Sequence, residues 1–144
     1  MKRFAVIAAV AALLIVDTAA AEDRFDCRNP NESANIVNFD RAAKAVTFTS
    51  DLDGKPFDHL APCAALDMVI HSALGGDVRA NRLLASARCG SAVENDVMVA
   101  NLVGADQSID VVVTLVFDAV RLRLTTSMRI ANHATVLERT CKRL

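Results

Sequence analysis

Residues 97–125, VMVANLVGADQSIDVVVTLVFDAVRLRLT, decide the fold class of this chain. They contain three apolar runs of strand length, rich in β-branched residues, at 97–103, 109–117 and 120–125. A polar loop and a short Asp-Ala link separate the runs, so we expect a three-strand antiparallel meander. The middle run is apolar on both sides, which predicts a central strand covered on both faces.

Similar patterns lie outside this stretch. Apolar runs at 36–39 and 45–49 flank a turn-like segment, which predicts a hairpin. Turn-forming residues follow it, and we expect irregular structure from there to Pro62. A more polar run at 135–141 predicts a last strand, placed at an edge of the sheet.

Residues 64–89 fit two interpretations. Leu66, Val69 and Ile70 share a face at helical spacing, but alternating apolar and polar residues also fit two strands joined at a Gly-Gly turn. We favour the β-hairpin because the surrounding segments have strand patterns. The fold class is therefore expected to be all-β, a small disulfide-stapled antiparallel sandwich or barrel. The alternative is an α+β fold with a helical hairpin at 62–89.

The N-terminus has the pattern of a secretory signal peptide over 1–21. Two basic residues precede an apolar run at 4–16, and small residues end in Ala21, after which we expect cleavage. The run is shorter than the roughly 20 residues that cross a bilayer, and Asp17 interrupts it, so no stable membrane anchor is expected after cleavage. Residues 22–144 are then expected to form a single β-rich domain in the periplasm or outside the cell.

Four cysteines remain after cleavage, an even number in a compartment where disulfides persist. A glycine pair at 75–76 lies midway between Cys63 and Cys89, and a chain reversal there would bring these cysteines together. We therefore predict a Cys63–Cys89 disulfide, and by elimination a second disulfide between Cys27 and Cys141.

Charge and aromatic content argue against nucleic-acid binding. Without Lys2, Arg3 and Asp17 of the leader, 14 basic residues (16 minus 2) face 16 acidic residues (17 minus 1), a net charge of −2. The chain has no Tyr or Trp, so the stacking platforms of single-strand binders are missing.

No motif indicates catalysis. The sequence 51–54, Asp-Leu-Asp-Gly, resembles the opening of a calcium loop but lacks the remaining ligands, and we interpret it as an acidic turn. His59, His71 and His133 have no metal-ligand spacing, and no serine lies in a Gly-x-Ser-x-Gly context. We therefore predict no catalytic residue, metal or cofactor.

The leading functional hypothesis is an exported, non-catalytic binding protein, with inhibition of, or an accessory role toward, another envelope or extracellular protein as one form of that function. Polar loops on a rigid sheet suit such recognition, and the candidate contacts are Asp51, Asp53, Lys55, Asp106 and Gln107. One alternative is a small hydrolase, which requires a cleft with a buried histidine or acid beside a polar partner. Another is a structural envelope component that forms homo-oligomers.

Overall fold

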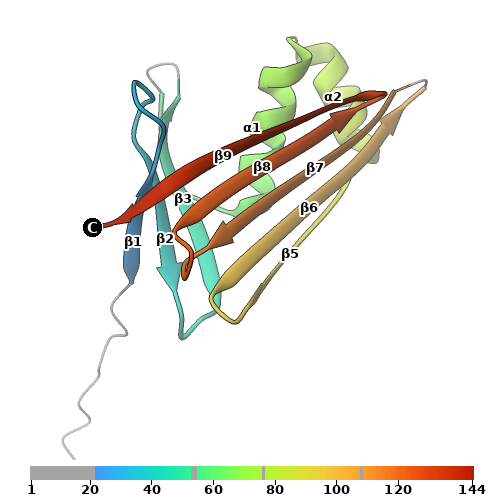
Figure 1. Cartoon of the computed structure of the whole chain (residues 1–144). Helices are drawn as coiled ribbons and strands as arrows, with labels where there is room; N and C mark the ends of the chain where they lie inside the picture. The colour runs from blue at the N-terminus through green and yellow to red at the C-terminus, as the bar shows by residue number, and fades with distance from the viewer. Residues whose placement is uncertain (1–21, 53–54, 76, 108) are drawn as a thin grey trace, which may run out of the picture.

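The computed structural model describes residues 22–52, 55–75, 77–107 and 109–144. Nine antiparallel strands form one curled sheet, half of a barrel, and two short helices lie against it (Figure 1). The predicted antiparallel, disulfide-stapled β fold is confirmed in this form. The predicted leader lies outside the described residues, as does Asp53.

The strands follow the order β4-β3-β2-β1-β9-β8-β7-β6-β5 across the sheet. Their bounds are β1 (Asp23–Cys27), β2 (Asn35–Asp40), β3 (Ala45–Leu52), β4 (Lys55–Leu60), β5 (Arg88–Glu94), β6 (Val97–Asp106), β7 (Ile109–Asp118), β8 (Arg123–Ile130) and β9 (His133–Arg143). The helices are α1 (Pro62–Leu74) and α2 (Asp77–Ser86), which come between β4 and β5 in the chain.

The last strand is at the centre of the sheet, so its predicted place at an edge is wrong. β9 pairs with β8 on one side and with β1 on the other. Its polar composition reflects its exposure, since Cys141 is the one buried residue of β9. Nothing in the pattern of β9 alone reveals that the first strand returns to pair with it.

The predicted hairpin at 36–49 is present as β2 and β3. The meander is present too, but its third strand begins only at Arg123. The Asp118 carboxylate accepts hydrogen bonds from the amides of Val120 and Arg121, at 3.0 and 2.9 Å, and so builds a longer turn. Residues 55–60, expected to be irregular, form β4 instead because they pair with β3.

The middle strand of the meander, β7, is covered on one face only. Its concave side chains, such as Val111, Val113 and Phe117, are fully buried, whereas the alternate residues on the convex face are half-buried or exposed. The prediction of coverage on both faces is therefore wrong. Val112 and Val116 on the convex face are only half-buried.

Residues 62–74 and 77–86 form helices, so the favoured β-hairpin is wrong and its alternative is confirmed. Pro62 starts α1, and Gly75, with φ of 63°, ends it in the left-handed conformation. Leu66 and Ile70, four residues apart, are completely buried against the sheet. The helical spacing of the apolar residues was the correct signal.

The two halves of the sheet meet in an aromatic cluster on the concave side. Phe117 of β7 packs edge to face against Phe25 of β1 and Phe39 of β2, with ring centroids 5.1 and 6.2 Å apart. All three rings are buried. Burial of rings this large stabilises the closure of the sheet around its concave side.

Both disulfides have the predicted pairing, and no cysteine in the described residues is free. Cys27 and Cys141 face each other across the β1–β9 ladder, with Cα atoms 4.0 Å apart, and both are buried. The Cys63–Cys89 disulfide ties the first turn of α1 to the edge strand β5.

We predict that the two disulfides differ in their contribution to stability. The Cys27–Cys141 bond spans 114 residues and the Cys63–Cys89 bond spans 26. Loop-closure entropy then gives roughly 5 and 3.5 kcal/mol respectively. Urea unfolding should therefore show a larger decrease in the free energy of unfolding for the double variant C27A/C141A than for C63A/C89A. The reverse order would mean that chain entropy does not dominate.

Gly104 of β6 lets α2 approach the sheet closely. A Cβ at this position would lie 3.1 Å from Leu83 Cδ2, 3.2 Å from Ala87 Cβ and 3.2 Å from the Leu83 carbonyl oxygen. The Ser86 hydroxyl donates to the Ala105 carbonyl at 2.6 Å, which fixes the end of α2 at the same place. The helix is thus held at a distance that a larger residue would not permit.

The substitution Gly104→Val should destabilise the protein by about 2 kcal/mol because of overpacking against Leu83 and Ala87. Gly90→Val in β5 is the matched control, since a Cβ there meets nothing within 4 Å and β-branched residues favour strands. Thermal unfolding of both variants is the measurement. Equal destabilisation of the two would contradict the close packing of α2.

Candidate functional site: a groove on the concave face

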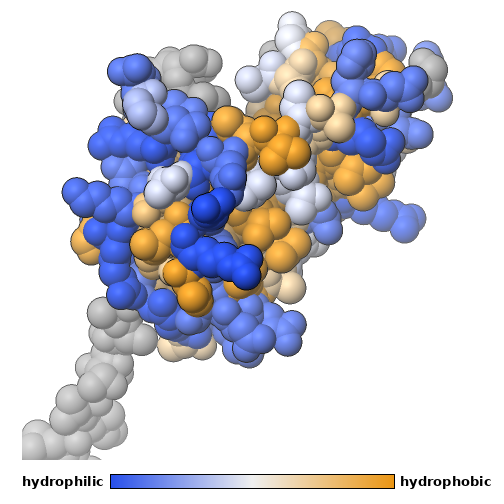
Figure 2. All heavy atoms as spheres, viewed as in Figure 1, coloured by the Kyte–Doolittle hydropathy of each residue, from blue (hydrophilic) through white to orange (hydrophobic). Residues whose placement is uncertain are grey.

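A groove with a volume of about 780 Å³ opens on the concave face, between α1 and the strands that curl around it. Its size lies within the usual range of small-molecule sites. Figure 2 shows a notch between the part formed by β1–β4 and the helices, with apolar atoms beneath it.

The groove has an apolar interior and a polar rim. Its apolar lining includes Phe48, Leu60, Met68, Val69, Leu115, Leu124, Met128 and Leu137. Its polar lining consists of Asn31, Glu32, Ser33, Asn35, Ser50, Ser72, Thr126, Thr135 and Arg139. Two methionines in the wall can adapt to ligands of different shape because the side chain is unbranched and polarizable.

Helix α1 supplies one wall because its apolar surface is wider than its contact with the sheet. Leu66 and Ile70 are completely buried in the core, whereas Met68, Val69 and Ser72 line the groove. Pro62 and the Cys63–Cys89 disulfide fix where the helix starts. The position of this wall is thus set by covalent and packing constraints outside the groove.

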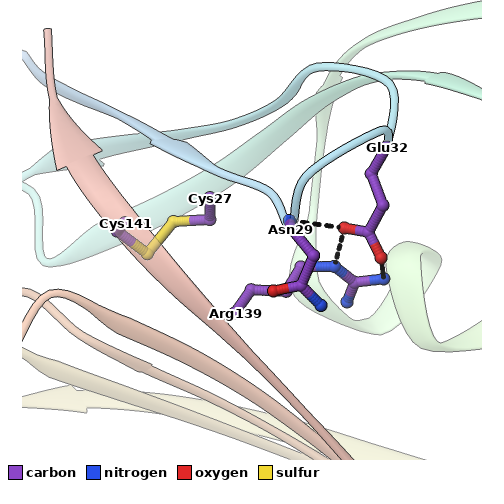
Figure 3. The surroundings of a disulfide bond; sticks show 5 residues. All are labelled: Cys27, Asn29, Glu32, Arg139 and Cys141. Atoms are coloured by element: carbon purple, nitrogen blue, oxygen red, sulfur yellow. Dashed lines mark hydrogen bonds and ion pairs between the residues drawn. A yellow bond between two sulfur atoms is a disulfide. The ribbon is translucent and has the colours of Figure 1, made fainter.

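An ion pair joins two segments of the rim (Figure 3). Arg139 Nε donates to Glu32 Oε2 at 2.7 Å and Arg139 Nη2 donates to Glu32 Oε1 at 3.3 Å, a two-point contact. The Asn29 amide also donates to Glu32 Oε2, at 2.9 Å. The loop between β1 and β2 is thereby held over β9, two residues from Cys141.

This arrangement stabilises the ionised form of Glu32. The hydrogen bond from Arg139, followed by the one from the Asn29 amide, holds the pKa of Glu32 below its ordinary value of 4.5, and partial burial opposes them. Among the described residues that line the groove, Glu32 and Arg139 are the only charged ones, and they neutralise each other. The groove therefore offers no net charge to a ligand.

A second polar cluster lies on the outer face of β2–β4. Thr47 Oγ1 is 3.4 Å from His59 Nδ1, His59 Nε2 is 3.4 Å from Asp58 Oδ1, and Thr49 donates to Asp58 at 3.0 Å. The order hydroxyl, imidazole, carboxylate is that of a nucleophile and its base. However, the side chains of His59 and Asp58 are 60% and 74% exposed, outside the groove, so the cluster lacks the water-excluded cleft that the hydrolase alternative requires.

The two predicted contact loops are not brought together. Asp51 and Lys55 lie at the β3–β4 connection, and Asp106 and Gln107 lie at the β6–β7 connection, on the other side of the helices (Figure 1). The Asp106 carboxylate is 3.6 Å from the Arg82 guanidinium of α2, and its side chain is only 16% exposed. Asp106 thus fixes α2 to the sheet.

The other two histidines lie away from each other, His71 half-buried on α1 and His133 exposed at the start of β9. Across the described ranges, no three His, Cys, Asp or Glu side chains form a group that could hold a metal ion. Within the same ranges, neither helix combines the length and the hydropathy needed to cross a membrane.

The sequence analysis did not identify the groove. One signal was available, because α1 carries apolar residues on most of its circumference, more than one contact face needs. The other walls come from β3, β8 and β9, whose meeting depends on the β1–β9 pairing. No local sequence pattern predicts that pairing.

No protein-family model, curated protein or solved structure matches this chain. The groove and its ion pair therefore carry the functional argument.

The lowered pKa of Glu32 predicts a stability change in acid. A carboxyl group whose pKa is lower in the folded state than in the unfolded state stabilises the fold at pH values above its unfolded-state pKa. This stabilisation is lost as the pH falls through the folded-state pKa. We expect Glu32→Gln to lower the urea midpoint at pH 7 and to reduce the difference between pH 7 and pH 3. Glu138→Gln, at an exposed ion pair with Arg123, is the control and should change neither quantity appreciably. An unchanged pH dependence in Glu32→Gln would contradict the assignment.

Proposed function

We propose that this chain is an exported, non-catalytic binding protein whose ligand site is the concave groove. The ligand is an uncharged apolar or amphiphilic small molecule with an extended hydrocarbon part. The observation that carries the proposal is a groove of about 780 Å³ with an apolar interior, neutral polar rim residues and one self-compensating ion pair.

The lining chemistry supports this ligand class. Phe48, Leu115 and Leu124 offer dispersion contacts and apolar surface, and burial of a hydrocarbon chain gains roughly 25 cal/mol per Å². Ser, Thr and Asn side chains at the rim suit a hydroxyl, amide or ester group. A fixed charge would be desolvated without a free counter-charge, because Arg139 is already paired with Glu32.

Export to an oxidising compartment is part of the proposal. Two disulfides that join distant segments of the fold support it, since such bonds persist in the periplasm and outside the cell. A covalently tied scaffold also loses little conformational freedom when it binds a ligand.

An accessory or inhibitory role toward another protein is the second candidate. The candidate surface for it within the described residues is the end of β6, where Gln107 is exposed, although the Asp106 carboxylate is paired with Arg82.

The groove can be tested with N-phenylnaphthylamine, an uncharged probe that fluoresces in apolar surroundings. We expect saturable binding, with displacement by a long-chain alcohol and weaker displacement by the matching fatty-acid anion. Ser72→Trp, which fills the groove mouth, should weaken binding by about tenfold. Asp67→Trp is the control, because Asp67 is exposed on α1 and does not line the groove.

Absence of saturable binding would overturn the proposal, and so would equal weakening by the two tryptophan variants. Circular dichroism of each variant establishes that the fold is intact.

A further inference from the structure

The strand β5 forms an open edge of the sheet. It pairs with β6 along seven consecutive residues, from Arg88 opposite Val103 to Glu94 opposite Val97. No strand in the described part of the chain pairs with its other side, and Figure 1 shows no labelled element beyond it. Except for Val93, every residue of β5 is exposed, including those on the concave side. The backbone groups on its outer side are thus free to pair with another chain.

The opposite edge differs from β5 in its sequence. β4 begins with Lys55 and Pro56, and its pairing with β3 shifts register between Phe48 and Ser50. Lysine, proline and bulges are the features by which natural sheets prevent pairing at an edge. β5 contains no lysine or proline, and its ladder with β6 is regular. Of the two edges, only β5 lacks this protection.

The charges on β5 are complementary to those of a second, antiparallel β5. If two copies pair about Ser91, then Arg88 of each copy lies opposite Glu94 of the other. Gly90 lies opposite Ala92 in the same register, so small side chains occupy the centre. Residues 88, 90, 92 and 94 share the convex face, so each charged pair meets on the same side of the joined sheet.

We propose that two copies of this chain associate through β5 about a two-fold axis at Ser91. The two sheets then continue into one, and both concave grooves open on the same side. Each copy uses the same patch, which closes the assembly at a dimer. The inference does not depend on the ligand of the groove.

Sedimentation equilibrium of the purified, oxidised protein up to about 1 mM tests the proposal. We expect a reversible dimer in the wild type. Arg88→Glu and Glu94→Arg should each weaken it by about tenfold or more, because like charges then face each other at both ends. The double variant R88E/E94R should restore the dimer, since it exchanges the charges. Arg79→Glu on α2 makes the same charge change at an exposed site away from β5 and should have no effect.

Three results would each overturn the proposal: a monomeric wild type over the whole range, equal weakening by R88E and R79E, or failure of the double variant to restore association. Hydrogen exchange of the wild type gives a test that needs no variant. Amides of β5 should become better protected as the protein concentration rises, and unchanged protection would contradict the dimer.

Discussion

The pairing of β1 with β9 is the constraint on which the rest of the structure depends. It joins the sheet of β1–β4 to the sheet of β5–β9, and it is made by the two ends of the described chain. The Cys27–Cys141 bond lies within this ladder, the Asp23–Arg143 ion pair reinforces it at 3.0 Å, and the Leu144 amide donates to the Arg24 carbonyl at 2.9 Å. A contact between such distant segments is entropically costly to form, which explains the value of a covalent bond there.

The groove is a consequence of that closure. Once β1 and β9 pair, the sheet curls, and Phe25, Phe39 and Phe117 fill the concave side where its two halves meet. The helices cover another part, since α2 packs on β6 through Gly104. The space between α1 and β8–β9 remains, and the Glu32–Arg139 pair fixes its rim. The strand β9 thus contributes both to the covalent closure of the fold and to the rim of the groove, because it carries Cys141 and Arg139.

The sequence predicted what is local. Alternating apolar residues and turn residues predicted the strand runs and the β2–β3 hairpin. The position of Gly75-Gly76 predicted the Cys63–Cys89 disulfide, and the Cys27–Cys141 disulfide followed by elimination. The β-hairpin predicted at 64–89 is wrong because the apolar residues there fit both periods, although a proline such as Pro62 is typical of a helix start. β9 was misplaced because its neighbour β1 is more than a hundred residues away. The groove was missed for the same reason, as its walls come from segments that only the tertiary fold brings together.

The positions of the charged and titratable side chains bear on the choice between the proposed binding role and the hydrolase alternative. General acid–base chemistry needs a titratable group beside a reacting atom in a water-excluded site. Here the Thr47–His59–Asp58 cluster has a suitable order, but the side chains of His59 and Asp58 are 60% and 74% exposed. Among the described residues that line the groove, the two charged ones, Glu32 and Arg139, are paired with each other. Burial in a neutral, apolar groove on a covalently tied sheet would give affinity at little cost in conformational entropy. These positions of the charges support the proposal of a ligand-binding groove.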